Sequence, residues 1–170
     1  SAYLPISGIL VSSEIVTGIE KLASELGIFG HGYTYSAHPG PAAAALRTLE
    51  LMEERKVVDH VRSITSLFLE RVDNLKRFNC VGNTRAVGLI GAMEFVGVPN
   101  TREKIDPKEK FSVKAQKLIQ DAGVILRSLP GDAIGFCPPL IILENQINEM
   151  FDRIESVMPE LDTMANEIGG

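Results

Sequence analysis

The sequence predicts an α/β fold whose second half is locally α+β. Three observations carry this prediction: a short apolar run near the start, long segments with apolar residues at helical spacing, and short glycine-punctuated apolar runs after residue 79. Residues 1–55 are expected to be the remnant of an α/β sheet from a larger domain. Residues 56–170 are expected to form a linking helix and a small α+β domain with an antiparallel sheet.

The first part of the chain opens on a strand-like run, Ile6–Ser12, with no strand or turn before it. We interpret it as one strand of a sheet that is cut open. Ser13 is expected to cap a helix that ends at Gly27. The apolar residues at helical spacing in that helix are Ile15, Ile19, Leu22, Ala23 and Leu26.

Four further helices are expected from apolar periodicity. They cover approximately residues 39–55, 57–78, 111–121 and 144–157. The first is rich in alanine and follows a polar loop, and the third is expected to end at Gly123. The tail beyond Pro159 is weakly patterned and is expected to fray.

The predicted strands lie between these helices. Residues 84–96 are expected to form one strand with a bulge or a close backbone contact at a glycine, and residues 124–127 and 133–136 two short strands around a turn. An extended segment is expected at 140–142. Residues 99–110 are charged and turn-rich, which predicts a mobile surface loop.

Composition narrows the class of protein. The net charge is −5, and the sequence contains no basic stripe that could neutralise the phosphates of a nucleic acid. The composition therefore argues against a nucleic-acid-binding protein. No apolar run is long enough for a membrane span, and the start lacks a secretory pattern, so a cytoplasmic protein is expected. Cys80 and Cys137 lack metal-type spacing and are expected to be reduced thiols.

The loop His31–Pro39 is the first candidate site, because it places imidazoles, phenols and hydroxyls just before a helix start. The Thr34 hydroxyl is suited to donate to a phosphate, and Tyr33 to stack on a planar ring. His31 and His38 have no acid or cysteine at ligand spacing. For these two histidines the pattern favours structural roles over a metal site, and for Thr34 and Tyr33 a self-contained loop remains the alternative.

Arg127 is the second candidate, because it ends an apolar run before a glycine turn and could bind a carboxylate through both guanidinium nitrogens. A surface salt bridge is the alternative for Arg127, and from the pattern alone it is the commoner outcome. Arg85, which begins a predicted strand, is a weaker candidate and is expected only to anchor an edge. Cys137 has no base beside it in the sequence and is interpreted as a buried structural thiol. Asp132 is expected to cap its own turn.

Three separated motifs together resemble the C-terminal part of the class III aminotransferases, which are pyridoxal-phosphate enzymes of fold type I. Within that class the sequence is most similar to the ω-amino-acid and amine:pyruvate transaminases. The motifs are His31–Pro39 with its alanine helix, Arg85–Glu94, and Arg127 with Asp132 and Cys137–Leu140. Ala37 departs from the family, which usually has glycine there.

The resemblance implies a role for each candidate. Thr34 would bind the phosphate of the cofactor held by the partner subunit of a homodimer, and Tyr33 would line the shared cofactor and substrate pocket. Arg127 would recognise the substrate carboxylate and swing aside for uncharged amines. The resemblance also implies that residues 1–55 come from the large pyridoxal-phosphate-binding domain.

In the family the Schiff-base lysine lies just before the segment that corresponds to Ser1–Ile6, so we assign no catalytic residue in this chain. No metal is expected either. The expected function is transfer of an amino group from an amine or ω-amino acid to a keto acid such as pyruvate. The 170-residue chain by itself is expected to be inactive. The alternatives are a non-catalytic interaction module and, more weakly, a metal protein using His31 and His38.

Overall fold

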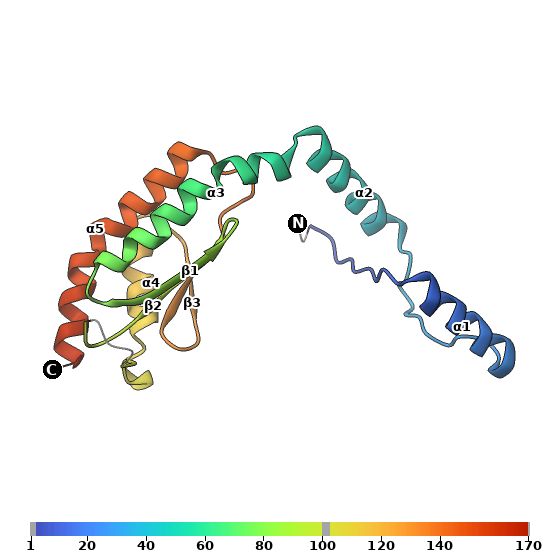
Figure 1. The fold of residues 1–170 in the computed structure, drawn as a ribbon, viewed down its shortest axis with the longest axis horizontal. Helices are drawn as coiled ribbons and strands as arrows, with labels where there is room; N and C mark the ends of the chain where they lie inside the picture. Colours follow the sequence, from blue (N-terminus) through green and yellow to red (C-terminus); the bar gives the residue numbers. More distant parts are fainter. Residues whose placement is uncertain (1–2, 100–102, 170) are drawn as a thin grey trace. The chain divides into compact units, whose positions relative to one another are not determined.

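The computed structural model describes residues 3–99 and 103–169, and the chain divides into two compact units, Ser1–Arg55 and Lys56–Gly170 (Figure 1). We call them unit 1 and unit 2 and describe each by itself. The two units divide the chain after Arg55, where the first subsection also divides it. The interpretation of unit 1 as the remnant of a larger domain stays a prediction.

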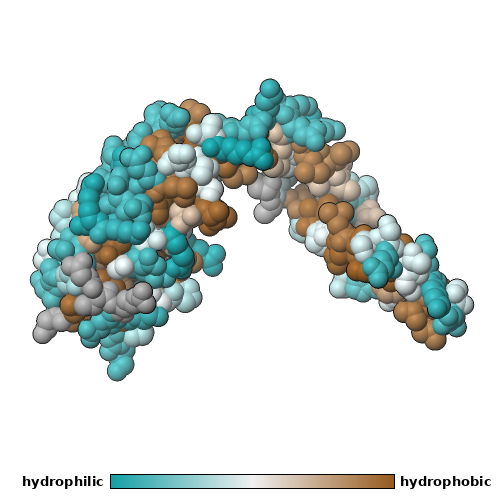
Figure 2. All heavy atoms as spheres, viewed as in Figure 1, coloured by the Kyte–Doolittle hydropathy of each residue, from teal (hydrophilic) through white to brown (hydrophobic). Residues whose placement is uncertain are grey.

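Unit 1 consists of helix α1 (Ser13–Leu26), helix α2 (Pro39–Glu54) and the loop that joins them. The side chain of Ser12, rather than the predicted Ser13, caps α1 by accepting the N–H of Ile15 at 3.4 Å. Gly27 ends α1 as predicted. Neither helix contains a buried residue. Apolar side chains therefore lie on the surface of this unit (Figure 2), with Ile15 52% and Leu26 83% exposed.

The predicted strand at Ile6–Ser12 is wrong, because residues 5–12 have no regular secondary structure. A strand is defined by its hydrogen bonds to a neighbouring strand, and an apolar sequence cannot supply that neighbour by itself. Ile9 and Leu10 remain 84% and 103% exposed. The apolar pattern of this segment is therefore not used for packing within the described chain.

Unit 2 is built on a four-stranded antiparallel sheet with the strand order β1-β2-β4-β3. The strands are β1 (Val81–Val87), β2 (Ile90–Phe95), β3 (Arg127–Leu129) and β4 (Ala133–Phe136). This sheet confirms the predicted mixed α/β fold with an antiparallel second half. It places β3 at one edge, with β4 as its only strand neighbour among the described residues.

The single strand predicted over residues 84–96 is wrong, since the chain turns back on itself there. Val87 pairs with Ile90 across a tight turn, so β1 and β2 form a hairpin. Gly88 has a φ of +56°, a left-handed conformation that glycine adopts without steric cost. Gly88 is therefore a turn residue. The close contact expected at a glycine is found at Gly91, where an added Cβ would lie 3.2 Å from that of Ala86.

The strand predicted at 124–127 begins three residues later than expected, at Arg127. The segment before it is irregular, and Ile125 is 84% exposed. The extended segment predicted at 140–142 is instead a turn closed by the N–H of Ile142, which donates to the carbonyl of Pro139 at 3.0 Å. The carbonyl of Ile142 lies 2.8 Å from His60 Nε2, which ties this turn to the first helix of unit 2.

The helices of unit 2 pack against the sheet and each other (Figure 1). Helix α3 (Val57–Asn74) lies against β1 and β2, helix α4 (Phe111–Asp121) against β3 and β4, and helix α5 (Glu144–Gly169) against α3 and α4. Short 3₁₀ helices, η1 (Leu75–Arg77) and η2 (Pro107–Glu109), complete the described elements. Their shared core is fully buried and includes Phe68, Phe111, Phe136 and Phe151.

Helix α5 continues well past the residue where the sequence predicts fraying. It contains Pro159 and extends to Gly169, with Met158, Leu161 and Ala165 at most 2% exposed. Proline removes a helix hydrogen bond, but burial of the apolar side chains on either side of it outweighs that loss. The prediction of a frayed tail is therefore wrong.

Of the predicted loop at 99–110, residues 100–102 lie outside the described residues. The remainder is partly ordered by the core, because Ile105 is 3% exposed and η2 follows it. Among the described helices, none is both long and apolar enough to cross a membrane.

Candidate functional site

A tight turn organises the polar loop of unit 1. The N–H of Ser36 donates to the carbonyl of Tyr33 at 2.9 Å, and the N–H of Tyr33 donates to Ser36 Oγ at 3.0 Å. These reciprocal hydrogen bonds place Thr34 and Tyr35 at the apex of the turn. Sequence analysis did not single out Ser36, although a serine three residues after an aromatic in a glycine-bounded loop is typical of such side-chain-to-backbone closure.

Thr34 lies where its hydroxyl can meet a ligand. The side chain makes no hydrogen bond to any residue that the structure describes. No aspartate or glutamate lies between Gly30 and Gly40, so no carboxylate of this loop opposes an anion. The hydroxyl is a donor, but the start of α2 adds no free backbone donor, because Pro39 and Pro41 lack an N–H and the N–H of Gly40 donates to His38.

Tyr33 lines a pocket that lies wholly within unit 1 and has a volume of about 830 Å³. The pocket is bounded by the loop, by residues 4–7 and by the start of α2. Thr34 is not one of its lining residues. Tyr33 is 77% exposed, and its ring meets the ring of His31 edge-on at 5.6 Å between centroids.

The two loop histidines have structural partners. His38 caps α2, because its Nδ1 accepts the N–H of Gly40 at 3.2 Å. His31 packs against the ring of Phe29 as well as that of Tyr33. No group of three or more metal-ligating side chains occurs in the part of the chain that the structure describes. Ala37, where the family usually has glycine, has a φ of +59°.

Arg127 and Arg85 are distinguished by their partners. Arg85 lies within β1 rather than at its start, and it pairs with Glu94 on the neighbouring strand. Arg127 is exposed at the start of β3 and has no ion pair or side-chain hydrogen bond to any described residue. Its guanidinium is therefore available for an external carboxylate.

The strand register places both arginines on one face of the sheet. Arg85 lies opposite Ala92, Ala92 opposite Gly135, and Gly135 opposite Arg127. Residues directly paired across antiparallel strands share a face. Between the two arginines the backbone carries only a methyl group and a hydrogen atom, and the side chain of Leu129 covers Gly135, because a Cβ there would lie 3.0 Å from Leu129 Cδ1.

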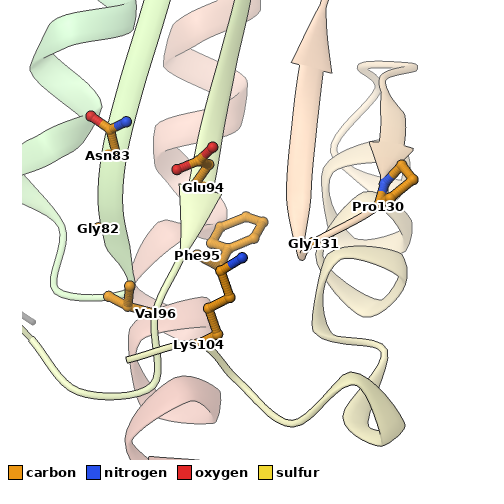
Figure 3. Close-up of a pocket in the computed structure, with 8 residues that line it drawn as sticks. All are labelled: Gly82, Asn83, Glu94, Phe95, Val96, Lys104, Pro130 and Gly131. Carbon is orange, nitrogen blue, oxygen red and sulfur yellow. The ribbon is translucent and has the colours of Figure 1, made fainter. Parts of the chain in front are cut away.

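A second pocket, of about 570 Å³, lies at the end of the sheet where β2 leads toward Lys104 (Figure 3). Asn83 and Glu94 project into this region from neighbouring strands (Figure 3). The hydrogen bond from Arg85 lowers the pKa of Glu94 despite its partial burial. Glu94 is thus a carboxylate committed to Arg85, which makes it unsuited to accept or donate protons near neutral pH.

Two sequence interpretations near Arg127 are corrected. Asp132 does not cap its own turn: its Oδ1 accepts the N–H of Ser112 at 3.0 Å, at the start of α4, whose cap residue Lys110 has no capping side chain. Cys137 is exposed rather than buried, because it follows the buried Phe136 at the end of β4 and points to the opposite side.

Cys80 is the buried thiol of the chain, and it is poorly suited to act as a nucleophile. Burial, and next the neighbouring Asp162 carboxylate, raise its pKa. The thiolate is the reactive form of cysteine, so this environment keeps Cys80 inert. Asp162 also accepts the backbone N–H of Cys80 at 2.7 Å, which is a structural contact between the start of β1 and α5.

The predicted site residues thus fall into two groups. Thr34 and Tyr33 are neighbours in unit 1, and Arg127 lies in unit 2. The contacts that hold Arg127's strand, made by Gln116 and Ser112 of α4, were not foreseen from the sequence. They join residues 12 and 16 positions apart and follow no periodic pattern.

Comparison with known proteins shows the family to which this chain belongs. The family model described as aminotransferase class-III matches residues 3–158. This chain therefore belongs to the class III aminotransferases, which confirms the resemblance seen in the sequence. It spans about a third of the length of the relatives it matches.

Individual relatives agree with this assignment. An uncharacterized aminotransferase of Sinorhizobium fredii is 36% identical over 95% of this chain and 36% of its own. A putrescine–pyruvate aminotransferase of Pseudomonas aeruginosa is 34% identical over 88% of this chain and 32% of its own. The structure of a PMP-bound aminotransferase from Vibrio fluvialis superposes with a TM-score of 0.85 at 27% identity, over 91% of this chain and 34% of its own.

Proposed function

We propose that the complete protein is a transaminase that uses pyridoxal 5'-phosphate to transfer an amino group from an amine or ω-amino acid to a keto acid such as pyruvate. Family membership supports amino-group transfer. The similarity to a putrescine–pyruvate aminotransferase supports a diamine-type donor and a keto-acid acceptor. The remaining assignments concern which residues of this chain serve that reaction.

The observation that carries the proposal is the free guanidinium of Arg127. A keto acid such as pyruvate carries a carboxylate, and a planar guanidinium binds a carboxylate through two parallel hydrogen bonds. Arg127 has no partner among the described residues, whereas Arg85 on the same sheet face is neutralised by Glu94. We therefore assign carboxylate recognition to Arg127 and a structural role to Arg85.

The residues of the loop fit the proposed cofactor. Thr34 offers a hydroxyl donor with no competing partner among the described residues and no carboxylate in its loop, as a phosphate ligand requires. Tyr33 offers an exposed aromatic ring beside the 830 Å³ pocket. When bound, pyridoxal phosphate withdraws electrons from the carbon that loses its proton. Thr34 and Tyr33 would bind and orient the group, and Arg127 the substrate.

A homodimer follows from the role that we propose for Thr34, which is to donate to the phosphate held by the partner subunit. Unit 1 supplies a surface for such an assembly, because the apolar residues of α1 and α2 are exposed. Burying exposed apolar surface is the main driving force for subunit association. We propose that the loop 31–38 completes a site shared between two chains.

We expect the complete protein to show turnover in an absorbance-monitored amine:pyruvate assay and the isolated 170-residue chain to show none. The chain matches about a third of the length of its relatives, and the residues that hold the cofactor covalently are expected outside it. Turnover by the isolated chain would contradict this division. If the complete protein transfers no amino group from any amine tested, the non-catalytic interaction module becomes the better reading.

Replacing Thr34 with alanine in the complete protein is expected to weaken binding of pyridoxal phosphate about 10-fold. A hydrogen bond to a charged group contributes about 1.5–3 kcal/mol, and loss of the hydroxyl removes the donor. The affinity is measured by titrating the apoprotein with the cofactor and following its absorbance. Thr34→Ser keeps the hydroxyl and is the matched control, with an affinity within about two-fold of the unmodified protein. Equal weakening in both variants would argue against a phosphate contact.

A further inference from the structure

Strand β3, which begins with Arg127, has few attachments of its own. It is three residues long and lies at the edge of the sheet, and within residues 3–99 and 103–169 only β4 pairs with it. The segment before it is irregular. An edge strand presents backbone groups that no other strand pairs. The position of Arg127 therefore depends on whatever holds the free edge of β3.

Two hydrogen bonds from α4 hold that edge, and both act on Ser128, the residue after Arg127. The N–H of Ser128 donates to Gln116 Oε1 at 3.3 Å. The hydroxyls of Ser128 and Ser112 lie 3.0 Å apart, and Ser112 is 4% exposed. Asp132, at the turn between β3 and β4, caps the first turn of α4 through the N–H of Ser112. Helix α4 and β3 are thus joined by side chains rather than by a strand ladder.

The pairing of β3 with β4 sets the face on which Arg127 lies, and the contacts to α4 hold the strand in that orientation. Successive side chains of a strand project to opposite faces, so holding Ser128 against α4 directs Arg127 to the face that α4 does not cover. On that face Arg127 lies opposite Gly135 and is exposed, while Leu129, two residues further along β3, packs over Gly135. A rotation of β3 about its axis would turn Arg127 away from this face.

We propose that Gln116 is a positioning residue for Arg127 and thereby for recognition of the substrate carboxylate, an inference that rests on the function proposed for Arg127. Gln116 does not touch the substrate. It pairs the one backbone N–H that fixes the rotation of the edge strand next to the guanidinium. Its effect is therefore confined to substrates that carry a carboxylate.

The test is Gln116→Ala in the complete enzyme, with kcat/KM measured separately for pyruvate and for an amine without a carboxylate. The two substrates react in successive half-reactions, so each kcat/KM reports its own half. We expect kcat/KM for pyruvate to fall about 3- to 10-fold, the range for loss of one hydrogen bond. The value for the amine is expected to stay within about two-fold.

Gln120→Ala is the matched control, because Gln120 lies one turn further along α4, is exposed, and has no side-chain hydrogen bond to any described residue. It should leave both values within about two-fold. Ser128→Ala, which removes the hydroxyl contact to Ser112, should reproduce the selective loss for pyruvate. An equal loss for both substrates in Gln116→Ala would show a merely structural role, and no loss for pyruvate would overturn the proposal.

Arg127→Ala measured in the same series separates this inference from the function on which it rests. If Arg127→Ala lowers kcat/KM for pyruvate and Gln116→Ala does not, the positioning role is wrong and the carboxylate role of Arg127 stands. If Arg127→Ala leaves pyruvate unaffected, the proposed role of Arg127 itself fails, whatever the result for Gln116.

Discussion

Replacing Arg127 with alanine in the complete enzyme is expected to lower kcat/KM for pyruvate by about 10- to 100-fold. Charge-assisted hydrogen bonds contribute about 1.5–3 kcal/mol, and the guanidinium has no other described partner that would make its loss costly to the fold. Amines without a carboxylate should keep kcat/KM within about three-fold, because they have no group for the arginine to bind. Steady-state kinetics with both substrates measures the difference.

Two variants make this result interpretable. Arg127→Lys keeps the charge but loses the two-pronged geometry, so its activity with pyruvate should fall between those of the unmodified enzyme and Arg127→Ala. Arg85→Ala removes an arginine from the same sheet face whose charge is already paired with Glu94. If Arg85→Ala were as damaging to pyruvate as Arg127→Ala, recognition of the carboxylate could not be assigned to Arg127.

Replacing Phe151 with alanine is expected to lower the free energy of unfolding of unit 2 by about 3–5 kcal/mol. Phe151 is fully buried, its ring lies 5.8 Å from Phe68 and 5.6 Å from Phe136, and the guanidinium of Arg71 lies 5.6 Å from its centroid. Truncation leaves a cavity where α3, α5 and the sheet meet. Urea denaturation of the 170-residue chain, followed by circular dichroism, measures the change.

Val113→Ala is the control for that measurement, because Val113 is 52% exposed on α4. Its effect on the free energy of unfolding should be within about 0.5 kcal/mol. Since domains of this size are stable by only about 5–15 kcal/mol, Phe151→Ala should leave the unit close to unfolding. A loss below about 1 kcal/mol would mean that the aromatic cluster does not form the core described for unit 2.

The sequence could predict elements whose signal is local. The helix from residue 13 to 26 has apolar residues at regular spacing and a glycine at its end, and both its existence and its C-terminus are confirmed. The hairpin was missed because an apolar run broken by glycines has the same residue pattern whether Gly88 forms a bulge within one strand or a turn between two. The strand at 6–12 was wrong because pairing depends on a neighbour that this segment cannot encode.

The end of α5 was missed for a similar reason. Pro159 was given its usual meaning as a helix breaker, whereas the buried residues beyond it continue the helical spacing. In the candidate sites, Thr34, Tyr33 and Arg127 stand out in the sequence as members of short motifs. Gln116 does not, because its importance arises from a contact with an edge strand that exists only once α4 and β3 are packed.

The exposed helices of unit 1 have a thermodynamic consequence. Unit 2 has a core of its own and can be assigned an intrinsic free energy of folding, whereas α1 and α2 contain no buried residue from which such a value could arise. We expect their order to depend on what covers this apolar surface, either the rest of the complete protein or a partner subunit. For unit 1, formation of the loop 31–38 and coverage of the helices would be one equilibrium rather than two.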